Sequence, residues 1–277
     1  MIAKKILTTA ITISILMAID IATSAQIYSE PDKDQTKLAH AVYHAKCPPS
    51  QDVKEKYLCA LKKLGDGKEE NRKSKEILMM LSSQGISDAN YSLFENRRIL
   101  GITDKDAIQY LTKSAEEGYA AAQAKLGILF LNGEIVTQDN KESYKWIKAA
   151  AEKGNYDGMR YLSNYYFLGT GVDRDDTMGF YWQKKLYTDY GPLFDDWGML
   201  GKVYESGRGT PIDLAKAYMC YDLEGTIGIE KKARIAPQMT PEQRAEGLRL
   251  SREWQEKNHV YTMQSLGLSR QKDGSYR

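Results

Sequence analysis

The chain has 277 residues, with 39 Lys or Arg against 37 Asp or Glu, so its formal net charge is only +2. Basic pairs such as Lys62-Lys63 and Lys231-Lys232 are dispersed among acidic residues and form no basic stripe. A nucleic-acid-binding protein normally carries such a stripe, and the composition therefore argues against that class.

Residues 1–25 have the pattern of a cleaved secretory signal. Lys4-Lys5 precede a mostly apolar run over residues 6–19, and small residues follow at 23–25. The run is shorter than the roughly 20 apolar residues that a bilayer requires, and Asp20 interrupts it. We expect cleavage after residue 25, no membrane span in the mature protein, and a periplasmic or secreted location.

Residues 26–52 are expected to form an N-terminal helix and a linker. Cys47 and Cys59 flank two prolines near the end of one predicted helix and inside the next, where a disulfide would join the two helices. A zinc site built from these thiols with His40 and His44 is the alternative. Because a bridge would consume both thiolates, we favour the disulfide and expect no metal or cofactor.

From residue 53 to residue 228 the sequence predicts a series of helix pairs. We call the first helix of each pair the A helix and the second the B helix. The first predicted copy, at 53–85, is degenerate, and its helices are expected at 54–64 and 74–85. Four clearer copies follow, with the expected A and B helices in parentheses: 86–118 (88–98 and 106–118), 119–154 (120–133 and 140–154), 155–191, and 192–228 (195–207 and 213–221).

Three of these copies repeat the same residues. Leu126 to Gly133 recurs as Leu162 to Gly169 and again as Leu200 to Gly207, at intervals of 36 and 38 residues. A period near 36 is typical of a solenoid, in which neighbouring copies bury their apolar faces against each other.

The copy at 155–191 shows the local pattern best. Met159, Leu162, Tyr166 and Phe167 recur at helical spacing, which places them on one face of an A helix. Gly169 and Gly171 then permit a tight turn, Asp175 is the expected N-cap of the B helix, and Phe180, Trp182 and Leu186 follow within that helix.

These residues resemble the Sel-1-like repeat, a relative of the tetratricopeptide repeat. One copy carries Leu200-Gly201, Tyr204, Gly207, Gly209, Asp213 and Lys216-Ala217, and another carries Gly169, Gly171, Val172, Asp175 and Trp182. Departures include Ser163 for a glycine, Met178-Gly179 for Lys-Ala, and Cys220 in the tryptophan column, where we expect a buried thiol. The resemblance implies an all-α fold, an α-solenoid of antiparallel helix pairs wound as a right-handed superhelix.

Residues 229–265 follow the array and are expected to cap it. Thr240, Pro241 and Gln243 form a helix start with a capping box, and Leu248, Leu250 and Trp254 supply an apolar face. Residues 266–277 form a polar tail.

Catalysis is not expected. No histidine lies between His44 and His259, and Gly169-x-Gly171 lacks the strand and the third glycine of a phosphate loop. Asp173, Asp175 and Asp176 are better explained as caps and a solvated turn than as an acid–base pair.

The resemblance also indicates where a partner would bind. If A helices line the concave face, as in tetratricopeptide proteins, the partner-facing positions are Tyr91, Glu95, Arg98, Asp157, Arg160, Asn164, Phe167, Asp195, Lys202 and Glu205. Aromatic residues mixed with both charge signs suit a protein or peptide surface, although a merely solvated groove explains each position equally well.

We therefore expect a monomeric, non-enzymatic binding module of the bacterial envelope. An alternative within the resemblance is a periplasmic immunity protein that neutralises a lipase-type antibacterial effector of type VI secretion. A second alternative, implied by the cysteine-rich relatives, is a cell-wall or β-lactam hydrolase, for which the sequence offers no catalytic constellation.

Overall fold

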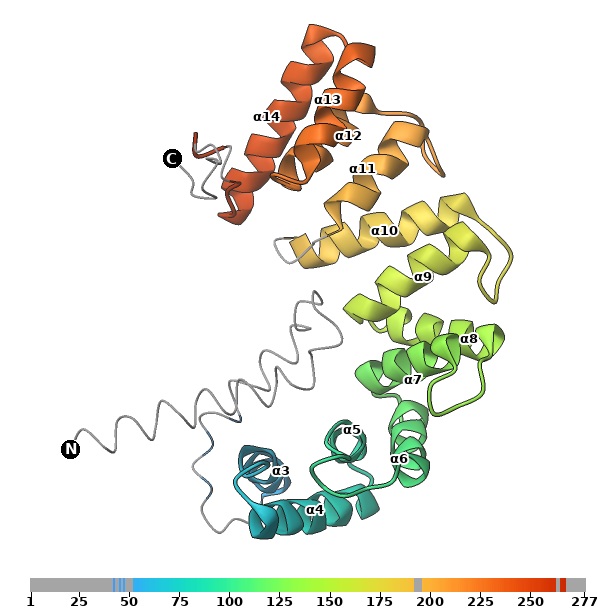
Figure 1. Ribbon diagram of the computed structural model, residues 1–277, viewed down its shortest axis with the longest axis vertical. Helices are drawn as coiled ribbons and strands as arrows, with labels where there is room; N and C mark the ends of the chain where they lie inside the picture. Colours follow the sequence, from blue (N-terminus) through green and yellow to red (C-terminus); the bar gives the residue numbers. More distant parts are fainter. Residues whose placement is uncertain are drawn as a thin grey trace, which may run out of the picture. The chain divides into compact units, whose positions relative to one another are not determined.

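The computed structural model describes Val42, Ala45, Cys47 and residues 52–191, 196–262 and 265–267. Regular structure within these residues is entirely helical, without any strand (Figure 1). This confirms the predicted all-α fold. The chain forms two compact units that divide after Asp157.

The first unit contains three successive helix pairs. Each A helix packs against the B helix that follows it, and α4 and α6 also pack against the next A helix. One apolar cluster includes Leu78, Leu81 and Leu93, and a second includes Leu111 and Leu126. The helices are α3 (Val53–Lys62), α4 (Lys68–Ser83), α5 (Ser87–Glu95), α6 (Asp104–Glu116), α7 (Ala120–Asn132) and α8 (Asn140–Glu152).

The second unit contains two further pairs and three additional helices. Helix α9 begins just before the division between the units. It packs against α10, where Ser163 binds the Gly179 carbonyl and Phe167 contacts Gly179, and α11 packs against α12. Helix α12 also packs against α13 and α14. The elements are α9 (Tyr156–Leu168), α10 (Asp176–Tyr190), α11 (Trp197–Ser206), α12 (Leu214–Leu223), α13 (Gly228–Ile235), the 3-10 helix η2 (Ala236–Gln238) and α14 (Pro241–Asn258).

The turn between A and B helices is built in the same way in three copies. The amide of the capping aspartate donates to the carbonyl nine residues earlier, at 2.9 Å each time, in Asp139, Asp175 and Asp213. Each of these carboxylates also accepts a backbone amide of the first turn of its B helix. The predicted role of Asp175 as an N-cap is therefore confirmed, and the repeat seen in the sequence is a repeat of backbone geometry.

Cys47 and Cys59 form the predicted disulfide, with their Cα atoms 5.3 Å apart. Neither thiolate is then available to a metal, and His40 and His44 lie outside the described residues, as do residues 1–25. Cys220 is buried, as expected for its place in the tryptophan column. No helix in the described part of the chain is both long and apolar enough to cross a bilayer.

The C-terminal helix α14 begins as the sequence indicates. Thr240 and Gln243 form a complete capping box around Pro241. The ring of Trp254 meets that of Trp197 edge to face, 4.8 Å between centroids, so α14 covers the last repeat as expected. Helix α13 was not predicted as a separate element.

Candidate functional site

The surface of α5 carries the first two predicted partner-facing residues. Tyr91 is half-buried, and its ring lies 5.2 Å from that of Tyr119. Burial, followed by the charges of Glu95 and Asp157, raises the pKa of the Tyr91 phenol well above its ordinary value, so the hydroxyl keeps its proton. The charges of Glu95 and Asp157 therefore both act on Tyr91, and the role of these residues in binding a partner stays a prediction.

Glu95 stands on the same face of α5, one helical turn after Tyr91. Its Oε1 atom is buried and accepts no hydrogen bond from any described residue. Its ion pair with the Lys125 ammonium on α7 is long, 3.8 Å between Nζ and Oε1. This carboxylate therefore retains an acceptor that the described part of the chain leaves unsatisfied.

Arg98 does not share that helix face. Helix α5 ends at Glu95, three residues earlier than the column pattern requires, and Arg98 lies exposed in the turn beyond it. Arg97, its neighbour, stacks over the Phe94 ring and pairs with Asp104 at 2.7 Å.

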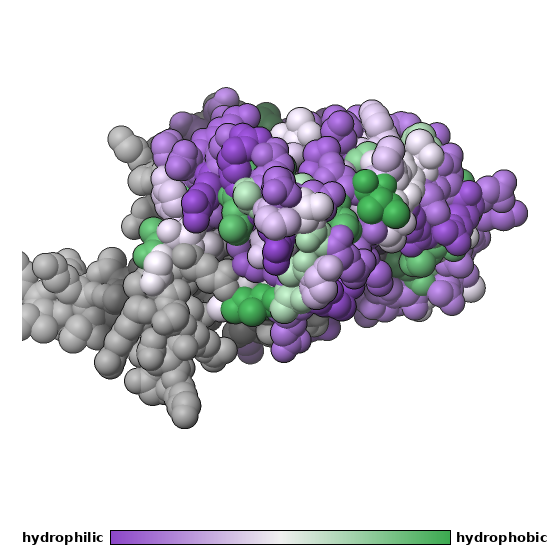
Figure 2. Space-filling view, turned by 90° about the horizontal axis from the view of Figure 1, so that it is seen from above, coloured by the Kyte–Doolittle hydropathy of each residue, from purple (hydrophilic) through white to green (hydrophobic). Residues whose placement is uncertain are grey.

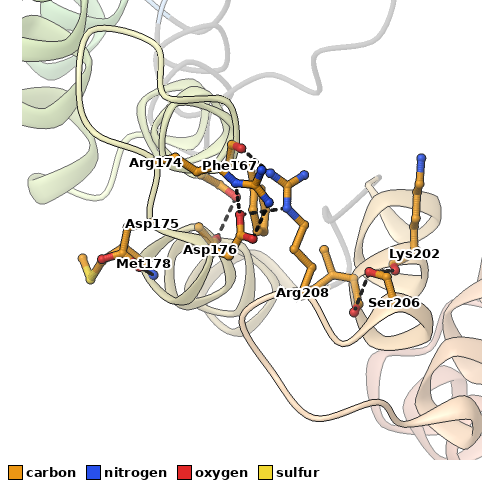
Figure 3. Close-up of polar contacts among 11 residues, drawn as sticks. Phe167, Arg174, Asp175, Asp176, Met178, Lys202, Ser206 and Arg208 are labelled. Carbon is orange, nitrogen blue, oxygen red and sulfur yellow. Dashed lines mark hydrogen bonds and ion pairs between the residues drawn. The ribbon is translucent and has the colours of Figure 1, made fainter.

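Phe167 is not a partner-facing residue, and that prediction is wrong. Only 4% of it is exposed, because its ring occupies the space where a side chain at Gly179 would stand. The Arg208 guanidinium covers the ring at 4.5 Å and donates to the Phe167 carbonyl (Figure 3). The other prediction for Phe167, that it belongs to the inward face of its helix, is correct.

The aspartates after Gly171 stabilise the turn. Arg174 and Arg208 both point at the carboxylate of Asp176, with contacts of 2.6 Å and 2.8 Å (Figure 3). The hydrogen bond from Arg174, assisted by Arg208, lowers the pKa of Asp176 to about 2. Asp175 accepts from the amide of Met178 at 3.0 Å. Asp175 thus caps a helix and Asp176 binds two arginines, in agreement with their predicted structural roles.

The remaining predicted residues lie on α9 and α11. Arg160 and Asn164 are half-buried on α9, and the Arg160 guanidinium stacks over Tyr161 at 5.0 Å. Lys202 on α11 is exposed. Asp195 lies outside the described residues.

Glu205 on α11 already has partners within the chain. Arg234 on α13 donates to both of its carboxylate oxygens, and the Tyr221 hydroxyl of α12 donates to Oε2 at 2.6 Å. The bonds from Arg234 are the main cause that lowers the pKa of Glu205.

Two further cationic side chains of α13 bind carboxylates in the last turn of α12 and just after it. Lys231 binds Glu224 at 2.6 Å, Lys232 binds Asp222, and Ile235 is fully buried. A short basic helix of this protein thus lies against the last helix pair. Sequence reasoning missed Arg234, and also Tyr119 and Lys125, because their relevance depends on helices that pack together in space.

Exposed large hydrophobic residues occur on several helices, among them Met79 on α4, Tyr181 on α10 and Ile229 on α13. Figure 2 shows a face on which hydrophilic residues predominate and hydrophobic ones form small separate groups. No group of His, Cys, Asp and Glu suited to a metal ion occurs among the described residues.

Comparison with known proteins agrees with this architecture. The Sel1 repeat family model matches residues 104–119, 120–155, 157–186 and 199–223. No curated protein matches the chain significantly.

Two crystal structures share the fold. One is a protective antigen present in uropathogenic Escherichia coli strains that displays an SLR fold, with TM-score 0.57, 23% identity and coverage of 76% of this chain. This chain spans only 50% of that antigen. The other is a Sel1 repeat protein from Oxalobacter formigenes, with TM-score 0.56, 22% identity, and coverage of 79% of this chain and 92% of that one.

Proposed function

This chain belongs to the Sel1-repeat family, and from that premise we propose that it is a scaffold that binds a protein partner through the surface of its A helices. Stacked helix pairs present extended surfaces, which suits recognition of a macromolecule. The mixed aromatic and charged residues of α5 and α11 are the kinds of side chain that protein interfaces use.

One observation carries the proposal most directly. The surface of α11 and α12 already binds a polypeptide helix, since α13 packs there through Arg234, Lys231 and the buried Ile235. Arg234 and Lys231 make the polar contacts, and Ile235 makes the buried apolar contact. The helix pairs of this protein are therefore chemically suited to bind a helix, and a partner would use the same contacts on other pairs.

We propose that this binding takes place in the bacterial envelope. The signal pattern of residues 1–25 supports export. The Cys47–Cys59 disulfide supports it independently, because disulfides persist in oxidising compartments. Fractionation of the source bacterium, with N-terminal sequencing of the mature chain, tests this: a cytosolic chain that retains residues 1–25 would refute it.

Site-directed photocrosslinking tests the binding surface. A photoreactive residue at Asn164, Lys202 or Lys125 samples A helices, and the same residue at Lys148 or Lys184 samples exposed positions of B helices. We expect one protein of the envelope to crosslink at A-helix positions and not at the B-helix controls. Crosslinks confined to the controls, or none at all, would refute the proposal.

A further inference from the structure

The Tyr91–Glu95 pair on α5 lacks a cationic partner that satisfies it. Within the described residues, the Glu95 Oε1 atom is buried and accepts no hydrogen bond. A buried polar atom without a partner costs free energy, which a bound ligand can recover. A donor from outside the described chain would be stabilised here.

The same chain contains a tyrosine and a carboxylate that do bind an arginine, although these two residues lie on different helices. In the second unit a tyrosine hydroxyl, from Tyr221, and a carboxylate, from Glu205, meet an arginine, Arg234. That guanidinium donates to both oxygens of Glu205, the bidentate geometry in which arginine binds carboxylates most strongly. The arginine arrives on α13, a helix of eight residues.

Lys125 does not play the part of Arg234 at Glu95. Its ammonium stands 3.8 Å from Oε1, beyond hydrogen-bonding distance, and it is a point charge without the planar fork of a guanidinium. The neighbouring rings of Tyr91 and Tyr119 add surfaces on which a guanidinium can stack.

We propose that Glu95 and Tyr91 form a subsite for an arginine side chain of the protein partner, presented on a short helix as Arg234 is presented on α13. The guanidinium donates to Glu95 and lies beside the Tyr91 ring. This subsite rests on the proposed function, because it specifies what the partner offers to the A-helix surface.

Selection from a displayed library of helical peptides, on the immobilised mature chain, provides the probe. We expect the selected peptides to carry arginine. Glu95→Gln keeps the shape of the side chain and removes its charge, and should weaken their binding by about tenfold or more. Tyr91→Phe should weaken it less, and citrulline in place of the peptide arginine should reproduce the Glu95→Gln loss.

Glu116→Gln is the matched control, since Glu116 is exposed on the B helix α6 and should leave the affinity unchanged. Far-UV circular dichroism of each variant confirms that its fold is retained. Selected peptides that bind Glu95→Gln and wild type equally would overturn the subsite and leave the proposed function standing. A library without binders overturns the subsite, and if crosslinking also finds no partner, the proposed function falls with it.

Discussion

Gly179→Ala should destabilise the protein, although alanine is ordinarily the better residue inside a helix by about 1 kcal/mol. Gly179 lies within α10, where a Cβ atom would stand 2.6 Å, 2.7 Å and 2.9 Å from three ring carbons of Phe167. Ordinary contacts between carbon atoms are about 3.5–4.0 Å. The added methyl group therefore requires the ring or the helix to move.

The ring has little freedom to move. Phe167 is buried, and the Arg208 guanidinium lies over its ring at 4.5 Å while donating to its carbonyl. Overpacking a core by one methylene costs about 1–3 kcal/mol, and this confined site belongs in the upper half of that range. After the gain in helix propensity, we expect a net loss of about 1–2 kcal/mol in the free energy of unfolding.

A double-mutant cycle with Phe167→Leu isolates the contact. In the Phe167→Leu background the ring is gone, so Gly179→Ala should be neutral or stabilising, with a coupling energy of about 1–3 kcal/mol. Urea unfolding followed by far-UV circular dichroism measures each corner. Lys184→Ala, exposed on the same helix, is the control and should change stability by no more than about 0.5 kcal/mol. If Gly179→Ala stabilises both backgrounds equally, the packing argument is refuted.

Three further predictions concern the turns and the disulfide. Ile135 has φ 64°, a value that glycine adopts more easily, and the equivalent residues in two other copies are Gly171 and Gly209. Ile135→Gly should therefore raise the free energy of unfolding, measured in urea, by about 1 kcal/mol, and a decrease of the same size would count against backbone strain at this position. Replacing Cys47 and Cys59 together by alanine should cost on the order of 3 kcal/mol, and reductant should reproduce that loss in the wild type but leave the variant unchanged. The Arg174 guanidinium lowers the pKa of Asp176 from 3.8 to about 2, so ionised Asp176 stabilises the fold above its unfolded pKa, and this contribution disappears as the pH falls from about 4 to about 2. In Asp176→Asn, the melting temperature should depend less on pH across that interval, and an unchanged profile would contradict the assignment.

The helices that the sequence predicted best are those with strong local end signals. Asp139, Asp175 and Asp213 each precede a B helix, and that helix begins at the next residue. Helix α4 begins instead at Lys68, six residues before the predicted start at position 74. Its first turns are polar and are stabilised by ion pairs such as Arg72 with Glu69 and Glu76, so a search for apolar periodicity does not detect them.

Helix α13 could not be predicted from local signals. It has eight residues and no side-chain N-cap, and only Gly228 and Ile235 are buried. An isolated helix of that length is not stable in water. It forms because its cationic side chains bind Glu205 on α11 and also Asp222 and Glu224 at the end of α12, so its existence follows from the packing of helices in the second unit.

The sequence did contain a signal that Phe167 is buried, namely the type of residue on the B helix that packs against it. Positions 167 and 205 are equivalent in their copies, five residues after Leu162 and Leu200, and the predicted site treated both as partner-facing. Gly179, twelve residues after Phe167 on the B helix, faces the Phe167 ring, and Ala217 is the equivalent residue in the copy that contains Glu205. Glycine leaves space for a ring, and Phe167 fills it. Fully buried Ala217 already has a Cβ in that position, and Glu205 is directed instead toward Arg234 and Tyr221. Glycine in place of the alanine of the repeat pattern therefore indicates a buried A-helix side chain, so a column must be interpreted together with the column that packs against it before its residues are assigned to a binding surface.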